Sequence, residues 1–136
     1  MSAAEVLAEL DARIDVIEEA YEFFLAYASQ GLASDSGSDT GRQAREYLKR
    51  CDTALTRFGE FLTGFIGRLG VEPVAPYLAF VGVIDSDAKH AQAAIQLVLA
   101  QPAISSQMVD NLNASIHLRA LLTDLFLIDE VIKSRR

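Results

Sequence analysis

The chain is poor in several residue types that would point to a particular chemistry or compartment. Its 136 residues include no tryptophan, three prolines and a single cysteine, Cys51. One cysteine cannot form an internal disulfide, so the sequence favours a reducing compartment. The opening residues, MSAAEVLAELDARID, lack both the basic region and the apolar region of a secretory signal peptide. We therefore expect a cytoplasmic protein.

Long apolar runs and basic side chains are also scarce. The longest strongly apolar run covers residues 74–84, whereas a membrane-spanning helix needs roughly 20 apolar residues. Twelve lysines and arginines stand against 19 aspartates and glutamates, which gives a formal net charge of −7. Nucleic acids and anionic lipids attract basic surfaces. We therefore expect neither a nucleic acid nor a membrane as partner of this acidic protein.

Helical periodicity is present along nearly the whole chain, and the alternation typical of strands is almost absent. Apolar residues recur at steps of three and four, which is a heptad pattern. A segment rich in Gly, Ser and Asp separates the first heptad-patterned region from the second, and such a composition is typical of loops. We predict helices over residues 3–29, 41–69, 73–101 and 105–133, with a flexible loop over 30–40.

The third predicted helix contains a possible break. Residues 85–87 read Asp-Ser-Asp, and such a triplet can begin a new helix. However, the heptad pattern continues in one register from Tyr77 to Val98, and a helix break would usually reset it. We therefore predict one uninterrupted helix.

Four long helices of similar length, joined by mostly short connections, are typical of an up-down-up-down four-helix bundle. With hydrophobic residues at 51% of the chain, we expect this all-α bundle to form a single domain. The first helix is acidic and the second begins with basic residues. This charge pattern favours antiparallel pairing, with Glu22 close to Arg45 or Lys49.

The third and fourth predicted helices carry more apolar residues than one bundle core requires. Residues 120–128, ALLTDLFLI, are apolar nearly all round the helix, and such a helix is usually buried on more than one side. We therefore expect a homodimer, or another protein partner, to cover these faces. A wide single core with scattered exposed apolar residues is the alternative. The candidate interface residues are Leu78, Phe80, Val83, Ile116, Phe126 and Leu127.

One short motif raises the question of a metal site. Asp87 precedes His90 by three residues, a spacing that di-iron bundles use to direct two ligands at one metal. In its topology the predicted bundle resembles ferritin-like proteins, which implies an alternative function in binding a metal or a small ligand. The candidate ligands are Glu18, Glu22, Glu60, Asp87, His90 and His117.

The ligand pattern is nevertheless incomplete. Ala114, not an acid, stands three residues before His117. The heptad pattern also directs His90 away from the core, whereas bundle metals are held by side chains that project inward. We therefore predict no metal and no cofactor, and we expect His117 to be a structural histidine paired with a carboxylate.

Signs of catalysis are weak as well. Cys51 falls on the heptad pattern, so we expect a buried thiol, not an exposed nucleophile. The chain has neither a glycine-rich phosphate loop nor a Gly-x-Ser-x-Gly motif. A small apolar ligand among Tyr21, Phe24, Phe58 and Phe65 is a further alternative, although such aromatic patterns usually form plain core. We predict a non-enzymatic protein that acts through self-association and protein–protein contacts.

Overall fold

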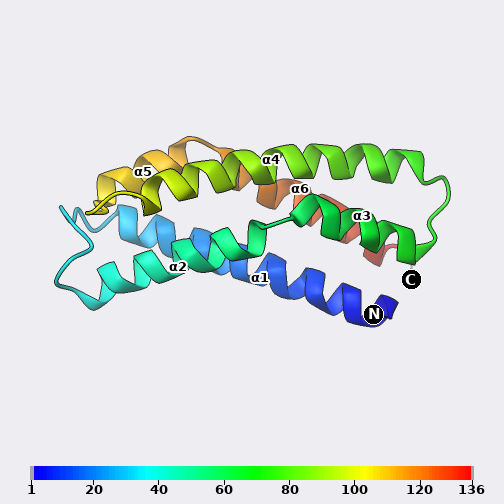
Figure 1. Ribbon diagram of the computed structural model, residues 1–136, viewed down its shortest axis with the longest axis horizontal. Helices are drawn as coiled ribbons and strands as arrows, with labels where there is room; N and C mark the ends of the chain where they lie inside the picture. The colour runs from blue at the N-terminus through cyan, green and yellow to red at the C-terminus, as the bar shows by residue number, and fades with distance from the viewer. Residues whose placement is uncertain (1, 136) are drawn as a thin grey trace.

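The computed structural model describes residues 2–135, and the secondary structure in that range is entirely helical. The molecule is elongated, and the start of α1 and the end of α6 lie at the same end of its long axis (Figure 1). None of the helices described combines the length and the apolarity needed to cross a membrane. The helices are α1 (Ala3–Ala28), α2 (Asp39–Leu55), α3 (Phe58–Leu69), α4 (Ala75–Leu99), α5 (Ser106–Ala114) and α6 (His117–Lys133).

The prediction of four helices is wrong in number, because residues 2–135 form six. The region predicted as one helix over 41–69 is divided into α2 and α3, and the region over 105–133 into α5 and α6. Each pair follows one path along the molecule (Figure 1). The third region is undivided, since α4 passes through residues 85–87 without interruption.

The break between α2 and α3 lies at Thr56 and Arg57. Thr56 is extended, and Arg57 adopts a left-handed conformation with φ of 55°. A helix end leaves carbonyl groups without intrahelical partners. Here Arg13 of α1 donates from Nη1 to the carbonyls of Ala54 and Thr56, at 3.5 and 3.4 Å. A side chain of the neighbouring helix therefore stabilises this break.

The break between α5 and α6 lies at Ile116, which has φ of 63°. A β-branched residue rarely adopts this conformation, and such strain costs about 1–3 kcal/mol. Ser115 caps the end of α5, because its hydroxyl donates to the carbonyl of Leu112 at 2.6 Å. Asn, Asp and Ser side chains compete with the helix for backbone partners, and residues 111–115 contain three of them. The local sequence therefore favours a helix end here.

The hydrophobic core is one cluster that receives side chains from all six helices. The heptad pattern of the second predicted helix continues across the break, so that buried residues lie on both sides of it. These residues are Leu48, Cys51, Leu55, Phe58, Leu62 and Phe65. The chain can therefore change helix at Arg57 and still present one apolar side to the core.

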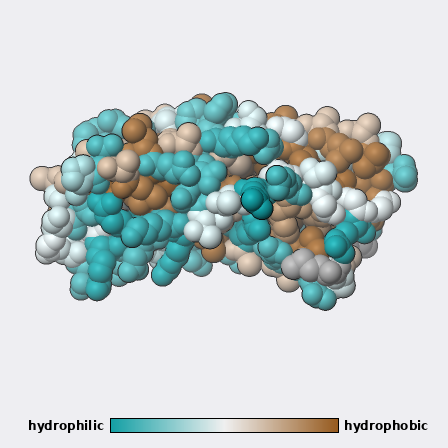
Figure 2. Space-filling view, viewed as in Figure 1, coloured by the Kyte–Doolittle hydropathy of each residue, from teal (hydrophilic) through white to brown (hydrophobic). Residues whose placement is uncertain are grey.

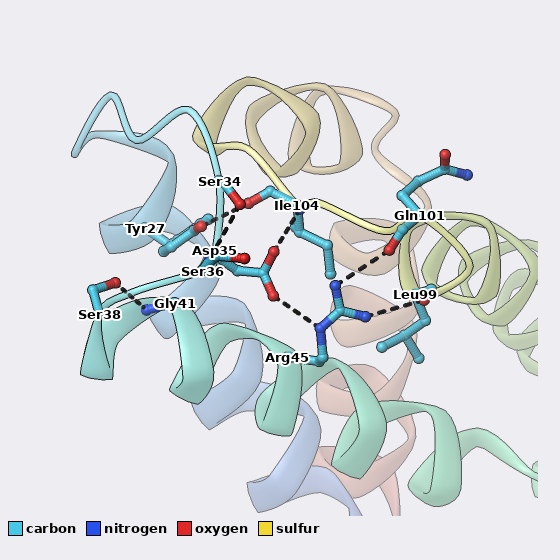
Figure 3. Close-up of polar contacts among 10 residues, drawn as sticks. All are labelled: Tyr27, Ser34, Asp35, Ser36, Ser38, Gly41, Arg45, Leu99, Gln101 and Ile104. Atoms are coloured by element: carbon cyan, nitrogen blue, oxygen red, sulfur yellow. Dashed lines mark hydrogen bonds and ion pairs between the residues drawn. The ribbon is translucent and has the colours of Figure 1, made fainter.

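The segment before α2, predicted as a flexible loop, is anchored by Asp35 (Figure 3). Its carboxylate pairs with Arg45 Nε at 2.9 Å and accepts the Ile104 backbone N–H at 2.7 Å. Arg45 also donates to the carbonyls of Leu99 and Gln101, each at 3.2 Å. The hydrogen bond from Arg45 lowers the pKa of Asp35, with a smaller contribution from Ile104 and against the effect of burial.

This arrangement corrects the expected partner of Arg45. The sequence predicts Glu22 close to Arg45 or Lys49; of these two, Arg45 pairs with Asp35. The same end of the molecule is joined further by Tyr27, whose hydroxyl donates to the carbonyl of Ile104 at 2.7 Å. Asp35 therefore joins the segment before α2, and Tyr27 joins α1, to the connection between α4 and α5.

Candidate functional site

The six candidate interface residues lie at or near the surface of α4, α6 and the break that precedes α6. Five of these side chains are between 43% and 61% exposed, and Phe80 is half-buried. In Figure 2, apolar side chains gather over the end of the molecule where α4 begins. Contiguous exposed apolar residues commonly mark protein–protein contact sites. The exposed five are Leu78, Val83, Ile116, Phe126 and Leu127.

A groove of about 300 Å³ separates the start of α4 from the end of α6. We call this the α4–α6 groove. It brings together Phe80 and Leu127 from the predicted set. Val83, Ile116 and Phe126 do not line it, and Leu78 lines a separate hollow between α3 and α4. Its lining consists of Pro76, Tyr77, Phe80, Leu127, Ile128 and Val131. Val74, which is 40% exposed just before α4, was missed by the sequence reasoning.

Polar contacts continue the line of this groove along the two helices, which run antiparallel. At the end of the groove near the end of α6, Arg135 donates to the Tyr77 hydroxyl at 3.3 Å. Beyond the groove, two pairs of titratable side chains lie along the line where α4 packs against α6, which we call the α4–α6 seam. These are the carboxyl pair, Asp87 with Asp124, and the ring pair, His90 with His117.

The carboxyl pair is the most unusual chemical feature of this seam. Asp87 and Asp124 are both half-buried, and Asp87 lies close enough to affect the pKa of Asp124. Burial first, and then the hydrogen bond and the charge of Asp87, raise the pKa of Asp124 to about 7. Its Oδ2 is buried with no hydrogen-bond partner among the residues described.

The ring pair answers the question raised by the Asp87–His90 spacing. The rings of His90 and His117 lie 5.4 Å apart between centroids, with their planes at 46°. His117 therefore contacts a second imidazole, where we expected a carboxylate. His90 is exposed and His117 is half-buried.

The remaining candidate ligands are distributed over other helices. Glu18 and Glu22 belong to α1, and Glu60 belongs to α3. Glu22 and Glu60 are exposed, while Glu18 is half-buried. Within residues 2–135, no three His, Cys, Asp or Glu side chains are placed to hold a metal ion together.

Two further groups from the sequence lie in the core. Cys51 is buried, and its burial, with a smaller effect of Asp52, raises the pKa of its thiol to about 12. A thiol reacts as its thiolate, so Cys51 is poorly placed to act as a nucleophile. Phe24, Phe58 and Phe65 are fully buried core residues, and Tyr21 packs against the same cluster.

Comparison with protein-family models, with curated proteins and with solved structures finds no match to this chain.

Proposed function

We propose that this chain is a non-enzymatic cytoplasmic protein that works by associating with a second copy of itself through the apolar surface of α4 and α6. The observation that carries the proposal is the α4–α6 groove, with Leu78, Val83, Phe126 and Leu127 exposed on the helices that form it. Removing apolar surface from water contributes roughly 25 cal/mol per Å², so covering these side chains favours association.

Charge at the edge of the groove supports a second copy as the occupant. The last two turns of α6 and the residues after it carry both signs, with Glu130 exposed and Arg135 beside Tyr77. In a two-fold interface the same surface is used by both subunits. Glu130 of one copy can then face Arg135 of the other, which offsets repulsion between two chains that each carry a net charge of −7.

We also propose that the six helices act as four rods in an up-down-up-down bundle. In this arrangement α2 with α3, and α5 with α6, each serve as one rod. Their successive positions along the molecule support it (Figure 1). The continuous row of buried residues across the α2–α3 break supports it as well. The apolar surface then lies on two adjacent antiparallel rods, the one formed by α4 and the one formed by α5 with α6.

A charge placed on the groove tests the proposed self-association. Leu127 is 53% exposed, so Leu127→Lys should leave the fold intact and shift the native mass to that of one chain. Leu25 of α1 is 48% exposed, and Leu25→Lys is the matched control, which should keep the wild-type mass. Unchanged assembly in the Leu127 variant, with folding intact, would rule out this surface.

A second candidate function, metal-ion binding, is favoured by the ring pair. Zinc lies about 2.0–2.1 Å from a bound imidazole nitrogen in tetrahedral sites, which places each ring centroid roughly 3.2 Å from the ion. Two such rings at a tetrahedral angle lie about 5.2 Å apart, close to the 5.4 Å between His90 and His117. Binding of zinc that His117→Ala abolishes would support this candidate, and no binding by the wild type would exclude it.

A further inference from the structure

We propose that the ring pair, His90 with His117, is one half of a zinc site, and that a second copy of the chain supplies the other half. Four imidazoles would then hold one ion between two chains. This inference rests on the proposed function, because it uses the contact between two copies. It adds a metal ion to that contact and makes the strength of association depend on the ion.

The geometry of the ring pair fits two ligands of one ion. The ring centroids lie 5.4 Å apart, where two imidazoles bound to one tetrahedral zinc ion lie about 5.2 Å apart. His90 belongs to α4 and His117 to α6, so the packing of these two helices sets the distance between the rings. Within residues 2–135, neither ring forms a hydrogen bond or an ion pair. An ion at this position therefore displaces no protein partner of either ring.

One chain alone leaves such a site incomplete. A structural zinc site has four protein ligands, whereas no three His, Cys, Asp or Glu side chains within the described part of the chain are placed to share an ion. The sequence has two histidines, and both are already in the ring pair. Its one cysteine, Cys51, is buried in the core. Further imidazoles must therefore come from another molecule, and a second copy brings the same two rings at the same separation.

A two-fold axis parallel to α4 and α6 brings the two ring pairs together. Both subunits use the same surface in such an interface, so each level of the α4–α6 seam faces the same level of the other copy. The groove then meets the groove, and the ring pair meets the ring pair. His117 lies ten residues before Leu127 of the groove, which is about 15 Å along α6. A standard interface covers about 800 Å² of each partner and is roughly 28 Å across, so one contact can include both features.

The surface around the ring pair is suited to burial against a second copy. Val83 and Leu97 lie seven residues before and after His90, which places the three side chains on one face of α4. Val83 is 46% exposed, Leu97 is 67% exposed, and Ile116, next to His117, is 61% exposed. A hydrophobic shell around a metal site limits the access of solvent to the ion. Covering these apolar side chains would place the ion inside the contact.

Charge also favours a cation at this place. Each chain has a net charge of −7, and the carboxyl pair begins about one turn from His90 along α4. A divalent ion between two copies offsets the repulsion between them. Lys89, beside His90, is engaged with Asp85 at 2.9 Å. Arg119 is two residues from His117, and residues at that spacing do not share a helix face.

Zinc content and native mass, measured together on chain that a chelator has freed of metal, test this inference. We expect the wild type to bind one zinc ion per two chains. Zinc at about ten times its dissociation constant for the dimer should raise the association constant about tenfold, because the ion binds two chains better than one.

His90→Ala and His117→Ala should show no response of association to zinc. His90 is exposed, so His90→Ala provides the test even if the half-buried His117 is needed for folding. Glu22→Gln removes an exposed acid of α1 and keeps both rings. It is the matched control and should respond to zinc as the wild type does.

The outcomes separate the shared zinc site from the proposed function. A chain that self-associates but binds no zinc, or binds one ion per chain without stronger association, would overturn the shared site and support self-association. A response to zinc that persists in both alanine variants would place the ion on the acidic surface and also overturn the shared site. Dimers that form only with zinc, with one ion per two chains, would support the shared site and contradict self-association without metal. A chain that stays single with and without zinc would contradict both.

Discussion

Removal of the Asp35 carboxylate should destabilise the fold far more than removal of an ordinary surface acid. Asp35 has a side chain that is 10% exposed, and its partner Arg45 is 27% exposed. In Asp35→Ala, Arg45 loses its ion pair and the Ile104 N–H loses its acceptor. The segment before α2 would then lose the contacts that hold it against the connection between α4 and α5.

The magnitude follows from these contacts. Breaking a buried ion pair costs about 3–5 kcal/mol, but Arg45 keeps two carbonyl acceptors and some contact with water. An unsatisfied buried N–H costs about 1–3 kcal/mol, and Ile104 is fully buried. We therefore expect Asp35→Ala to lower the free energy of unfolding by about 2–4 kcal/mol.

Glu46→Ala, on the helix α2 that carries Arg45, provides a control. Glu46 and Arg50 form an i,i+4 pair at 3.9 Å, with side chains 53% and 59% exposed. Its loss should cost under about 0.5 kcal/mol. Urea denaturation at pH 7 measures both values. A cost below about 1 kcal/mol for Asp35→Ala, or one equal to that of the control, would refute this reasoning.

The same pair predicts an acid limit of stability. The pKa of Asp35 is lowered in the folded chain from its ordinary value of 3.8. Such a group stabilises the fold fully above its ordinary pKa, and this contribution is lost as the pH falls through the lowered pKa. The difference in stability between wild type and Asp35→Ala should therefore be constant from pH 5 to pH 7 and should shrink below pH 4. A difference that stays constant down to pH 2 would show that the ion pair contributes nothing.

Three further predictions concern other positions. Gly41→Ala should destabilise the fold by more than about 2 kcal/mol, because a Cβ at Gly41 would collide with the backbone carbonyl of Asp35; an unchanged urea midpoint would contradict this. Cys51 should react with a thiol reagent at pH 8 only as fast as the chain unfolds, since its pKa is about 12 and it is buried; rapid labelling of the native protein would contradict its burial. Zinc should raise the melting temperature of the wild type and not of His117→Ala if the ring pair with His90 binds it, and an equal shift in both would place the ion elsewhere.

The heptad patterns were informative about helices and core because they report which side of the chain is buried. They did not predict the breaks between α2 and α3 and between α5 and α6. At Arg57 the chain turns through a left-handed residue, yet Leu55 and Phe58 are both buried on either side of it. A break that keeps the apolar side toward the core leaves the three-four spacing intact, so periodicity alone cannot find it.

The breaks are marked instead by residues that carry weaker signals. Ser115 follows two asparagines within the last turn of α5, and these residues favour turns. Ile116 gives no such signal, because a β-branched residue is disfavoured at positive φ. The left-handed conformation of Ile116 is therefore not predictable from residue preferences.

The candidate site was predictable in part. Exposure of Leu78 and Phe126 follows from their position outside the heptad pattern. The carboxyl pair does not, because Asp87 and Asp124 are far apart in sequence and meet only through the register of α4 against α6. Only the three-dimensional structure supplies that register.

The native mass of the wild-type chain, measured over a wide range of concentrations, tests the central claim most directly. One chain has a mass of 14.8 kDa. Self-association through α4 and α6 predicts a rise toward twice this value with concentration, and no such rise in Leu127→Lys. A mass that stays at that of one chain at every concentration would contradict the account.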